Sequence, residues 1–267
     1  MMKRHPRRAV RRFLPDLLAE GRYVFTRREV ERRMHVTPIA AYFALRRLEA
    51  AGEVVRLRPR LYLAVDPQHR AAGTMPPEWF IRDLMLDFGR PYYVGLLSAA
   101  QVHGAAHHRP QVFQVAVPGR GGRSLRAGNV EIMFFGKGAF DRSRTTDVKT
   151  PTGSMRVSDP ETTAWDLVRY SALAGGLGNV ATVLSELTER IDRRRLVQTA
   201  RRHGDQLVVR RLGYLLAQLH RKDLARSIGP LVGAGPARRL DPAEPATRSR
   251  EDRRWRLIIN ATVEPEA

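Results

Sequence analysis

The segment from Thr26 to Leu63 constrains the fold more than any other part of the chain. Two short helix patterns are followed there by the pattern of a basic β-hairpin. Thr26 and Glu29 form a capping box that starts the first helix. Thr37 caps the second helix and places Pro38 at its first position, where the missing N–H is not needed. This order of elements predicts a winged helix-turn-helix, whose second helix enters a DNA major groove with the hairpin beside it.

The second of these helices carries different side chains on its two faces. Its inner stripe, at helical spacing, consists of Ala41, Ala44, Leu45 and Leu48. Its outer face, the predicted DNA-reading surface, consists of Thr37, Ile39, Ala40, Phe43, Arg46 and Arg47. Apolar side chains can contact thymine methyl groups, and arginine can reach guanine or phosphate. An alternative for Phe43 is that it packs under the hairpin or against the preceding helix.

The hairpin follows Gly52, which ends the second helix. Glu53 to Val65 has the pattern of two strands joined by the turn Arg58-Pro59-Arg60. A rigid, basic hairpin tip can contact phosphates or a minor groove, so we expect DNA contacts from Arg56, Arg58 and Arg60. The alternative is an ordinary charged surface turn.

The charge distribution supports a nucleic-acid partner. Of the formal net charge of +20, about half lies in residues 1–70, which hold 17 Lys and Arg against 7 Asp and Glu. Such a field attracts phosphate and speeds association with nucleic acid. An alternative is an arginine-rich surface that reflects only a GC-rich genome. That alternative does not account for the helix and hairpin pattern.

Composition also limits the compartment. The chain contains no cysteine, which excludes structural disulfides and zinc–thiolate sites and is compatible with a reducing cytoplasm. No apolar run reaches the ~18 residues of a membrane span. No apolar signal core follows the basic N-terminus. We therefore expect a soluble cytoplasmic protein that does not contact a membrane.

The sequence divides into three regions in an α+β fold. Residues 1–70 form the expected winged helix-turn-helix domain, which opens with an amphipathic helix over Pro6–Glu20. A polar linker over Asp66–Pro77 leads to a mixed α/β domain, residues 75–228, which ends in a helical lobe. Residues 229–267 form a Pro/Ala/Arg-rich linker, expected to be flexible over Gly229–Arg250, and a C-terminal strand in Trp255–Val263 that would pair with the sheet.

Within the second domain, helix patterns precede and follow a small sheet. Strands are expected at Val112–Val117, Val130–Phe135 and Met155–Val157. Helices are expected at Trp79–Phe88, Tyr92–His103 (after a short extended start), from Ser158 or Asp159 through Val168, and at Asn179–Arg190, Asp192–His203 and Gln206–Leu219.

Several segments, in their order along the chain, resemble the AbiEi family of antitoxins and transcriptional regulators. These are Thr26–Leu63, YYVGLLSAAQVHG, QVFQVAV and TPTGSMRVSDPETTAWDLV, and the resemblance spans roughly Pro6 to Leu219. It implies an N-terminal winged helix and a C-terminal antitoxin domain in a type IV toxin–antitoxin system, a class of phage-defence system. The implied toxin is an AbiEii-like nucleotidyltransferase encoded next door, which is countered without a required stable complex. The implied autoregulation is repression through inverted-repeat operator DNA, bound by two copies through Thr37 to Arg47 and Arg56, Arg58 and Arg60.

Two alternatives to this interpretation are a stand-alone winged-helix transcriptional regulator and a DNA-targeted, metal-dependent nuclease. The nuclease would need two carboxylates and a lysine at a sheet edge, for which Glu131, Asp147 and Lys149 are the candidates. A short D-x-K spacing occurs often by chance, so ordinary surface charge is the favoured interpretation.

Other motifs are weaker. His103, His107 and His108 have metal-like spacing, but Gly104 interrupts them and no carboxylate is near in sequence. Ser98 and His103 lack the G-x-S-x-G turn of a nucleophile. The Gly119–Arg123 segment lacks the ending of a P-loop and is interpreted as a basic hairpin loop with a secondary nucleic-acid contact. We therefore expect no enzyme activity, cofactor or metal.

Overall fold

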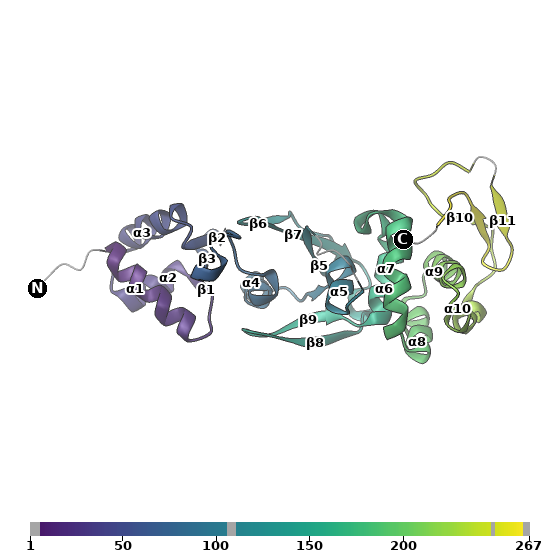
Figure 1. Ribbon diagram of the computed structural model, residues 1–267, viewed down its shortest axis with the longest axis horizontal. Helices are drawn as coiled ribbons and strands as arrows, with labels where there is room; N and C mark the ends of the chain where they lie inside the picture. The colour runs from purple at the N-terminus through teal and green to yellow at the C-terminus, as the bar shows by residue number, and fades with distance from the viewer. Residues whose placement is uncertain (1–5, 106–110, 247–248, 264–267) are drawn as a thin grey trace, which may run out of the picture.

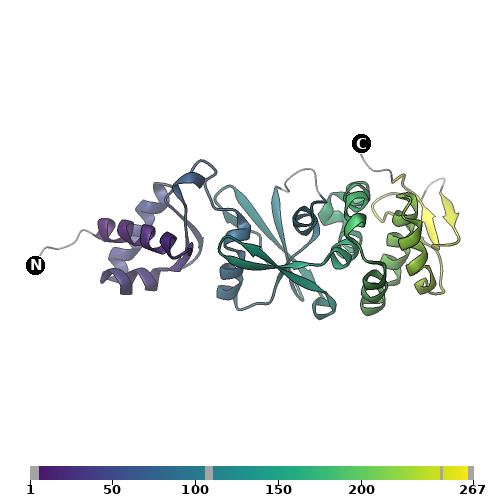
Figure 2. The ribbon, with the colours of Figure 1, turned by 60° about the horizontal axis from the view of Figure 1, so that its bottom comes forward.

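The computed structural model describes residues 6–105, 111–246 and 249–263 of the chain. The elements follow one another along the long axis of an extended molecule, as Figures 1 and 2 show. The N-terminal module contains the helices α1 (Pro6–Ala19), α2 (Arg27–Met34) and α3 (Pro38–Ala50). Its antiparallel sheet, in the order β1-β3-β2, contains β1 (Val24–Thr26), β2 (Val54–Arg58) and β3 (Leu61–Ala64).

A threonine side chain caps the N-terminus of each helix of the predicted pair, α2 and α3. The Thr26 hydroxyl accepts a hydrogen bond from the Glu29 amide at 3.2 Å, and the Thr37 hydroxyl accepts one from the Ala40 amide at 3.3 Å. These side chains satisfy amides that have no partner within the helix. The predicted inner stripe of α3 is fully buried. The helices, the hairpin and the stripe are therefore found where the sequence predicts them.

The second part of the chain is built on a six-stranded mixed sheet in the order β6-β7-β5-β4-β9-β8. Its strands are β4 (Tyr93–Val94), β5 (Val112–Pro118), β6 (Leu125–Ala127), β7 (Val130–Lys137), β8 (Thr145–Thr150) and β9 (Gly153–Ser158). Side chains alternate between its two faces, since Val115 and Phe134 join one apolar core and Ala116 and Phe135 the other. The sequence missed β6 and β8, which are polar edge strands without a regular apolar alternation.

Helices lie on both faces of this sheet. One core packs α4 (Ile81–Phe88) and the N-terminal hairpin against the sheet, and the other joins the sheet to the helical lobe. The lobe and the helices next to it are α5 (Leu96–Val102), α6 (Pro160–Arg169), α7 (Gly176–Leu187), α8 (Arg193–His203), α9 (Gln206–Gln218) and α10 (Lys222–Ile228). Short 3₁₀ turns occur at Pro67–His69, Pro77–Trp79, Phe140–Arg142, Ser171–Ala174, Thr188–Arg190 and Gly229–Leu231. None of the described helices is long and apolar enough to cross a membrane.

The C-terminal region corrects two expectations. A strand does form near the end of the chain, but it pairs in a separate sheet of order β10-β12-β11 and not with the main sheet. This sheet consists of β10 (Arg238–Arg239), β11 (Arg250–Asp252) and β12 (Leu257–Ile259).

The preceding segment, expected to be a flexible linker, is held against α9. Buried Arg210 donates hydrogen bonds to the carbonyls of Gly233 and Pro236, at 3.1 and 2.8 Å. Arg211 donates to the Arg239 carbonyl at 3.1 Å. Since a buried guanidinium needs acceptors, these arginines fix a backbone whose own composition favours no regular structure.

Candidate nucleic-acid interface

The outer face of α3 exposes a cluster of large apolar side chains. Ile39 is 71% exposed, Phe43 54% and Tyr42 39%, and the two aromatic rings meet edge to face at 5.4 Å. They make up three of the five exposed large hydrophobic side chains in the described part of the chain. The alternative that Phe43 packs into the module is therefore wrong. Exposed apolar clusters of this kind mark interaction surfaces.

The other predicted residues of α3 surround this cluster. Arg46 and Arg47 are exposed, and Arg46 pairs with Glu49 at 3.2 Å on the same helix. Ala40 is half-buried, and the exposed Thr37 uses its hydroxyl in the helix cap. Tyr42 was missed by the sequence analysis, although it lies one position from Phe43. The predicted inner stripe is correct, and Tyr42 lies outside it on the exposed face of α3.

The three arginines of the hairpin differ in their surroundings. Arg56 and Arg60 are exposed, and Arg60 adopts φ of 72° at the turn, where its carbonyl accepts a hydrogen bond from the Arg27 amide. Arg58 is half-buried and turns toward α4. Its guanidinium donates to the Asp87 carboxylate at 2.8 Å and lies over the Phe88 ring at 4.6 Å from the centroid. Two of the three predicted hairpin arginines therefore face solvent, while Arg58 joins the hairpin to the second domain.

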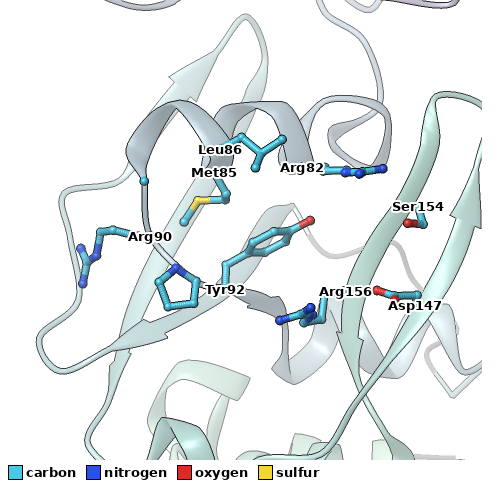
Figure 3. A pocket seen from close by; sticks show the side chains of 10 residues that line it. Arg82, Met85, Leu86, Arg90, Tyr92, Asp147, Ser154 and Arg156 are labelled. Carbon is cyan, nitrogen blue, oxygen red and sulfur yellow. The ribbon is translucent and has the colours of Figure 1, made fainter.

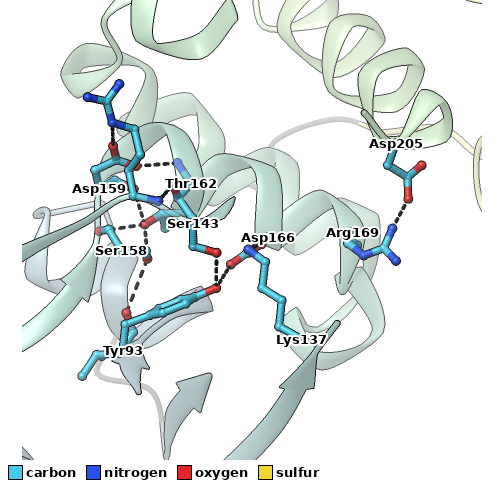
Figure 4. A network of polar contacts seen from close by, with 12 residues as sticks. Tyr93, Lys137, Ser143, Ser158, Asp159, Thr162, Asp166, Arg169 and Asp205 are labelled. Carbon is cyan, nitrogen blue, oxygen red and sulfur yellow. Dashed lines mark hydrogen bonds and ion pairs between the residues drawn. The ribbon is translucent and has the colours of Figure 1, made fainter. Parts of the chain in front are cut away.

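A buried polar network centred on Asp166 lies where α6 packs on the main sheet, as Figure 4 shows. Lys137 pairs with Asp166 at 2.5 Å, and the Tyr93 hydroxyl donates to the same carboxylate at 2.7 Å. Burial lowers the pKa of Lys137 and raises the pKa of Tyr93 well above its usual range. Asp166 is 0% exposed. The network therefore joins β4 and β7 to α6. The Asp166 carboxylate is too deeply buried for a large substrate to reach it.

The candidate nuclease residues are not brought together. Glu131 lies on β7 and Asp147 and Lys149 lie on β8, with β5, β4 and β9 between these strands. At about 4.8 Å per strand, roughly 19 Å separates them across the sheet. Asp147 instead pairs in register with Arg156, and both line a hollow of about 430 Å³ that also contains Arg82 (Figure 3). A carboxylate surrounded by arginines is better suited to pairing with a guanidinium than to binding two metal ions.

The residues of the remaining motifs are not brought together either. Ser98 accepts a hydrogen bond from the Gln114 amide at 2.9 Å, whereas the His103 ring contacts the Ser158 carbonyl at 2.7 Å, so they do not form a nucleophile pair. His107 and His108 lie outside the described residues. Over residues 6–105, 111–246 and 249–263, no three His, Cys, Asp or Glu side chains gather where they could hold a metal ion.

The fold and this surface define a class of two-part proteins, in which a small helical module with an exposed apolar and basic helix precedes an α/β domain. The N-terminal module, residues 12–65, matches the family model described as transcriptional regulator, AbiEi antitoxin. Residues 93–218 match the AbiEi antitoxin C-terminal domain. The chain belongs to the AbiEi antitoxin family, whose two models together span about two thirds of it.

A solved structure has the same overall fold. The crystal structure of the RV2827C protein from Mycobacterium tuberculosis is similar over 94% of this chain and 90% of that chain, with a TM-score of 0.60 and 17% sequence identity. Among curated proteins, no sequence matches the chain.

Proposed function

We propose that this protein is the antitoxin of a type IV toxin–antitoxin system and represses its own operon. In this proposal the N-terminal module is a winged helix-turn-helix that places α3 in the major groove of inverted-repeat operator DNA, with one copy on each repeat. The second domain counters a nucleotidyltransferase toxin without a stable complex, and the protein is not an enzyme. It acts in the cytoplasm as part of phage defence.

One observation carries the DNA-binding part of this proposal. The outer face of α3 exposes Ile39, Tyr42 and Phe43 beside Arg46 and Arg47, next to a basic hairpin. Apolar side chains contact thymine methyl groups, and arginines contact guanine and phosphate. Family membership supports the combination with an antitoxin domain.

The DNA-binding part is tested with the double variant Ile39→Ser/Phe43→Ser and DNA from upstream of the gene. We expect the variant to lose its preference for that DNA over random DNA by roughly 10-fold or more, because apolar contacts with thymine methyl groups contribute to sequence preference. The salt dependence should change little, because no charge is removed. Leu173→Ser is the control, since Leu173 is 39% exposed but lies between α6 and α7. An unchanged preference in the double variant would remove α3 from the interface.

The antitoxin part is tested by co-expression with the adjacent open reading frame. The full-length wild type and the full-length Ile39→Ser/Phe43→Ser variant should both rescue growth, because neutralisation is assigned to the second domain. A harmless neighbour, or failure of both proteins to rescue, would contradict the antitoxin role. DNA binding without any toxin next door would instead favour a stand-alone regulator.

A further inference from the structure

A small hollow lies where the main sheet meets the helical lobe. It has a volume of about 120 Å³, and its walls include Lys137, Trp165, Arg169, His203 and Asp205. These residues come from β7, from α6, from the end of α8 and from the turn that follows it. Pockets for drug-sized molecules are larger, at about 300–1,000 Å³. The hollow therefore suits a small ion or a few water molecules.

Two buried side chains of this hollow have unused hydrogen-bonding capacity. Lys137 is 2% exposed, and among the described residues the acceptor for its N–H groups is the Asp166 carboxylate alone. His203 is equally enclosed, and its Nε2 has no hydrogen-bond partner in the part of the chain that the structure describes. Buried polar groups without partners cost free energy. Such groups in a folded protein therefore indicate a bound water molecule or ion.

The charges around the hollow are predominantly positive. The lysine and the arginine that line it each have one carboxylate partner, Asp166 and Asp205 respectively. Arg142, which donates to the His203 carbonyl at 3.3 Å, and Arg202 add positive charge that no ion pair balances within the described residues. After burial, the charges of all these cations lower the pKa of His203 to about 3. The same excess of positive charge favours an anion over water.

Donors reach the hollow from three different elements. Lys137 lies on β7, Arg169 on α6 and His203 on α8, and Figure 4 shows Lys137 and Arg169 on the same side of Asp166. A tetrahedral oxyanion offers a separate oxygen atom to each donor, and charge-assisted hydrogen bonds of this kind are strong. The imidazole donates from Nε2 both as a cation and as the neutral tautomer that carries its proton there.

We propose that this hollow binds one inorganic phosphate ion, held by Lys137 Nζ, His203 Nε2 and the Arg169 guanidinium. The ion joins the main sheet to the helical lobe, since its ligands lie on β7, α6 and α8. The free ion is assigned, and not a phosphoryl group of a nucleotide. The reason is that the Arg169–Asp205 ion pair forms part of the outer wall and the volume leaves no room for a sugar and a base. This site is independent of the proposed DNA binding and of the toxin.

The first test is a phosphate titration of the full-length protein with ¹⁵N-labelled histidines, at neutral pH and constant ionic strength. We expect the Nε2 signal of His203, assigned by its absence in His203→Gln, to shift until it saturates. The signals of the exposed His220 should stay in place, because no site is proposed there. Chloride at the same ionic strength should have little effect on either histidine.

The second test is thermal unfolding, because a ligand that binds only the folded state raises the Tm. Phosphate at about ten times its dissociation constant should raise the wild-type Tm by a few degrees relative to chloride. Arg169→Gln should lose about half of this increase or more, since the amide keeps a donor but not the charge. The matched control is Arg193→Gln, which removes an exposed charge from the start of α8 and should keep the increase.

Three results would overturn the proposal. A His203 signal that does not respond to phosphate would mean that the hollow holds only water. Equal responses of His203 and His220, or equal increases of Tm in Arg169→Gln and Arg193→Gln, would mean that phosphate acts on the basic surface as a whole. A response of His203 to AMP but not to phosphate would assign the hollow to a larger ligand.

Discussion

Arginines of one hairpin have different physical roles because their neighbours differ. The sequence predicts DNA contacts from Arg56, Arg58 and Arg60 alike. In the folded protein, Arg58 is held by Asp87 and Phe88, while the others face solvent. An arginine that already has a carboxylate partner releases fewer DNA counterions than one that is free to meet a phosphate.

The comparison of Arg60→Ala with Arg58→Ala tests this difference. We expect Arg60→Ala to lower the salt slope of DNA binding by about one, and Arg58→Ala to lower it by less. Fluorescence anisotropy at several salt concentrations measures both slopes. Equal decreases would show that Arg58 leaves Asp87 when DNA binds.

A buried histidine makes stability depend on pH. His203 is 8% exposed, its ring stacks on Trp165 at 5.2 Å, and its Nε2 has no hydrogen-bond partner among the residues that the structure describes. Burial, followed by the nearby charges of Lys137 and three arginines, lowers the pKa of His203 to about 3. The folded protein therefore keeps this imidazole neutral at pH values where the unfolded chain protonates it.

We expect the free energy of unfolding to fall as the pH decreases below about 6.5 toward 3, by at most about 1.4 kcal/mol per pH unit from this residue. His203→Gln should show a shallower decrease between about pH 7 and pH 5 in urea unfolding. The exposed His220 provides the control variant His220→Asn, which should follow the wild type. A His203→Gln curve parallel to the wild-type curve would contradict the assignment.

Among the helices and strands, α9 shows how one small residue allows two elements to pack. A Cβ atom placed on Gly213 would lie 2.0 Å from the Trp255 ring, which is 1% exposed and belongs to the small C-terminal sheet region. The absence of a side chain at Gly213 therefore creates the seat for Trp255. In the sequence of α9 alone, Gly213 is recognisable only as a residue of low helix propensity.

Gly213→Ala should therefore destabilise the C-terminal region, whereas Gly178→Ala should be neutral or stabilising by up to about 1 kcal/mol. Gly178 lies inside α7, and a methyl group added there would meet no other atom within 4 Å, which makes it a matched helix control. Thermal unfolding and the tryptophan emission spectrum measure the two effects. Equal stability of the two variants would mean that Trp255 does not pack on α9.

For the whole molecule, one apolar core shared by the hairpin, α4 and the main sheet couples the N-terminal module to the second domain. Leu61 lies in this core, whereas Leu17 lies in the separate core of the N-terminal module. Leu61→Ala and Leu17→Ala should each cost about 2–5 kcal/mol. Only Leu61→Ala should increase native-state trypsin cleavage at Arg70, which lies in the segment between β3 and α4. Equal cleavage at Arg70 in both variants would argue against a coupling of the two parts through Leu61.

The sequence by itself determined the elements that depend on near neighbours. Thr26, Thr37 and Asp159 cap helices through side-chain contacts within three residues, and the inner stripe of α3 follows from helical spacing. Such signals are local, so they predict the N-terminal module and most strands and helices of the second domain. They also predict the exposed Ile39 and Phe43 of the candidate interface.

Only the tertiary structure decided which distant residues meet. The pairing of Arg58 with Asp87, the separation of Glu131 from Asp147 by three strands, and the support of residues 233–239 by Arg210 and Arg211 all join positions far apart in the chain. The edge strands β6 and β8 were missed for the same reason, because they depend on a neighbouring strand and not on apolar alternation. Long-range packing, which no local pattern encodes, thus set the surface beside α3.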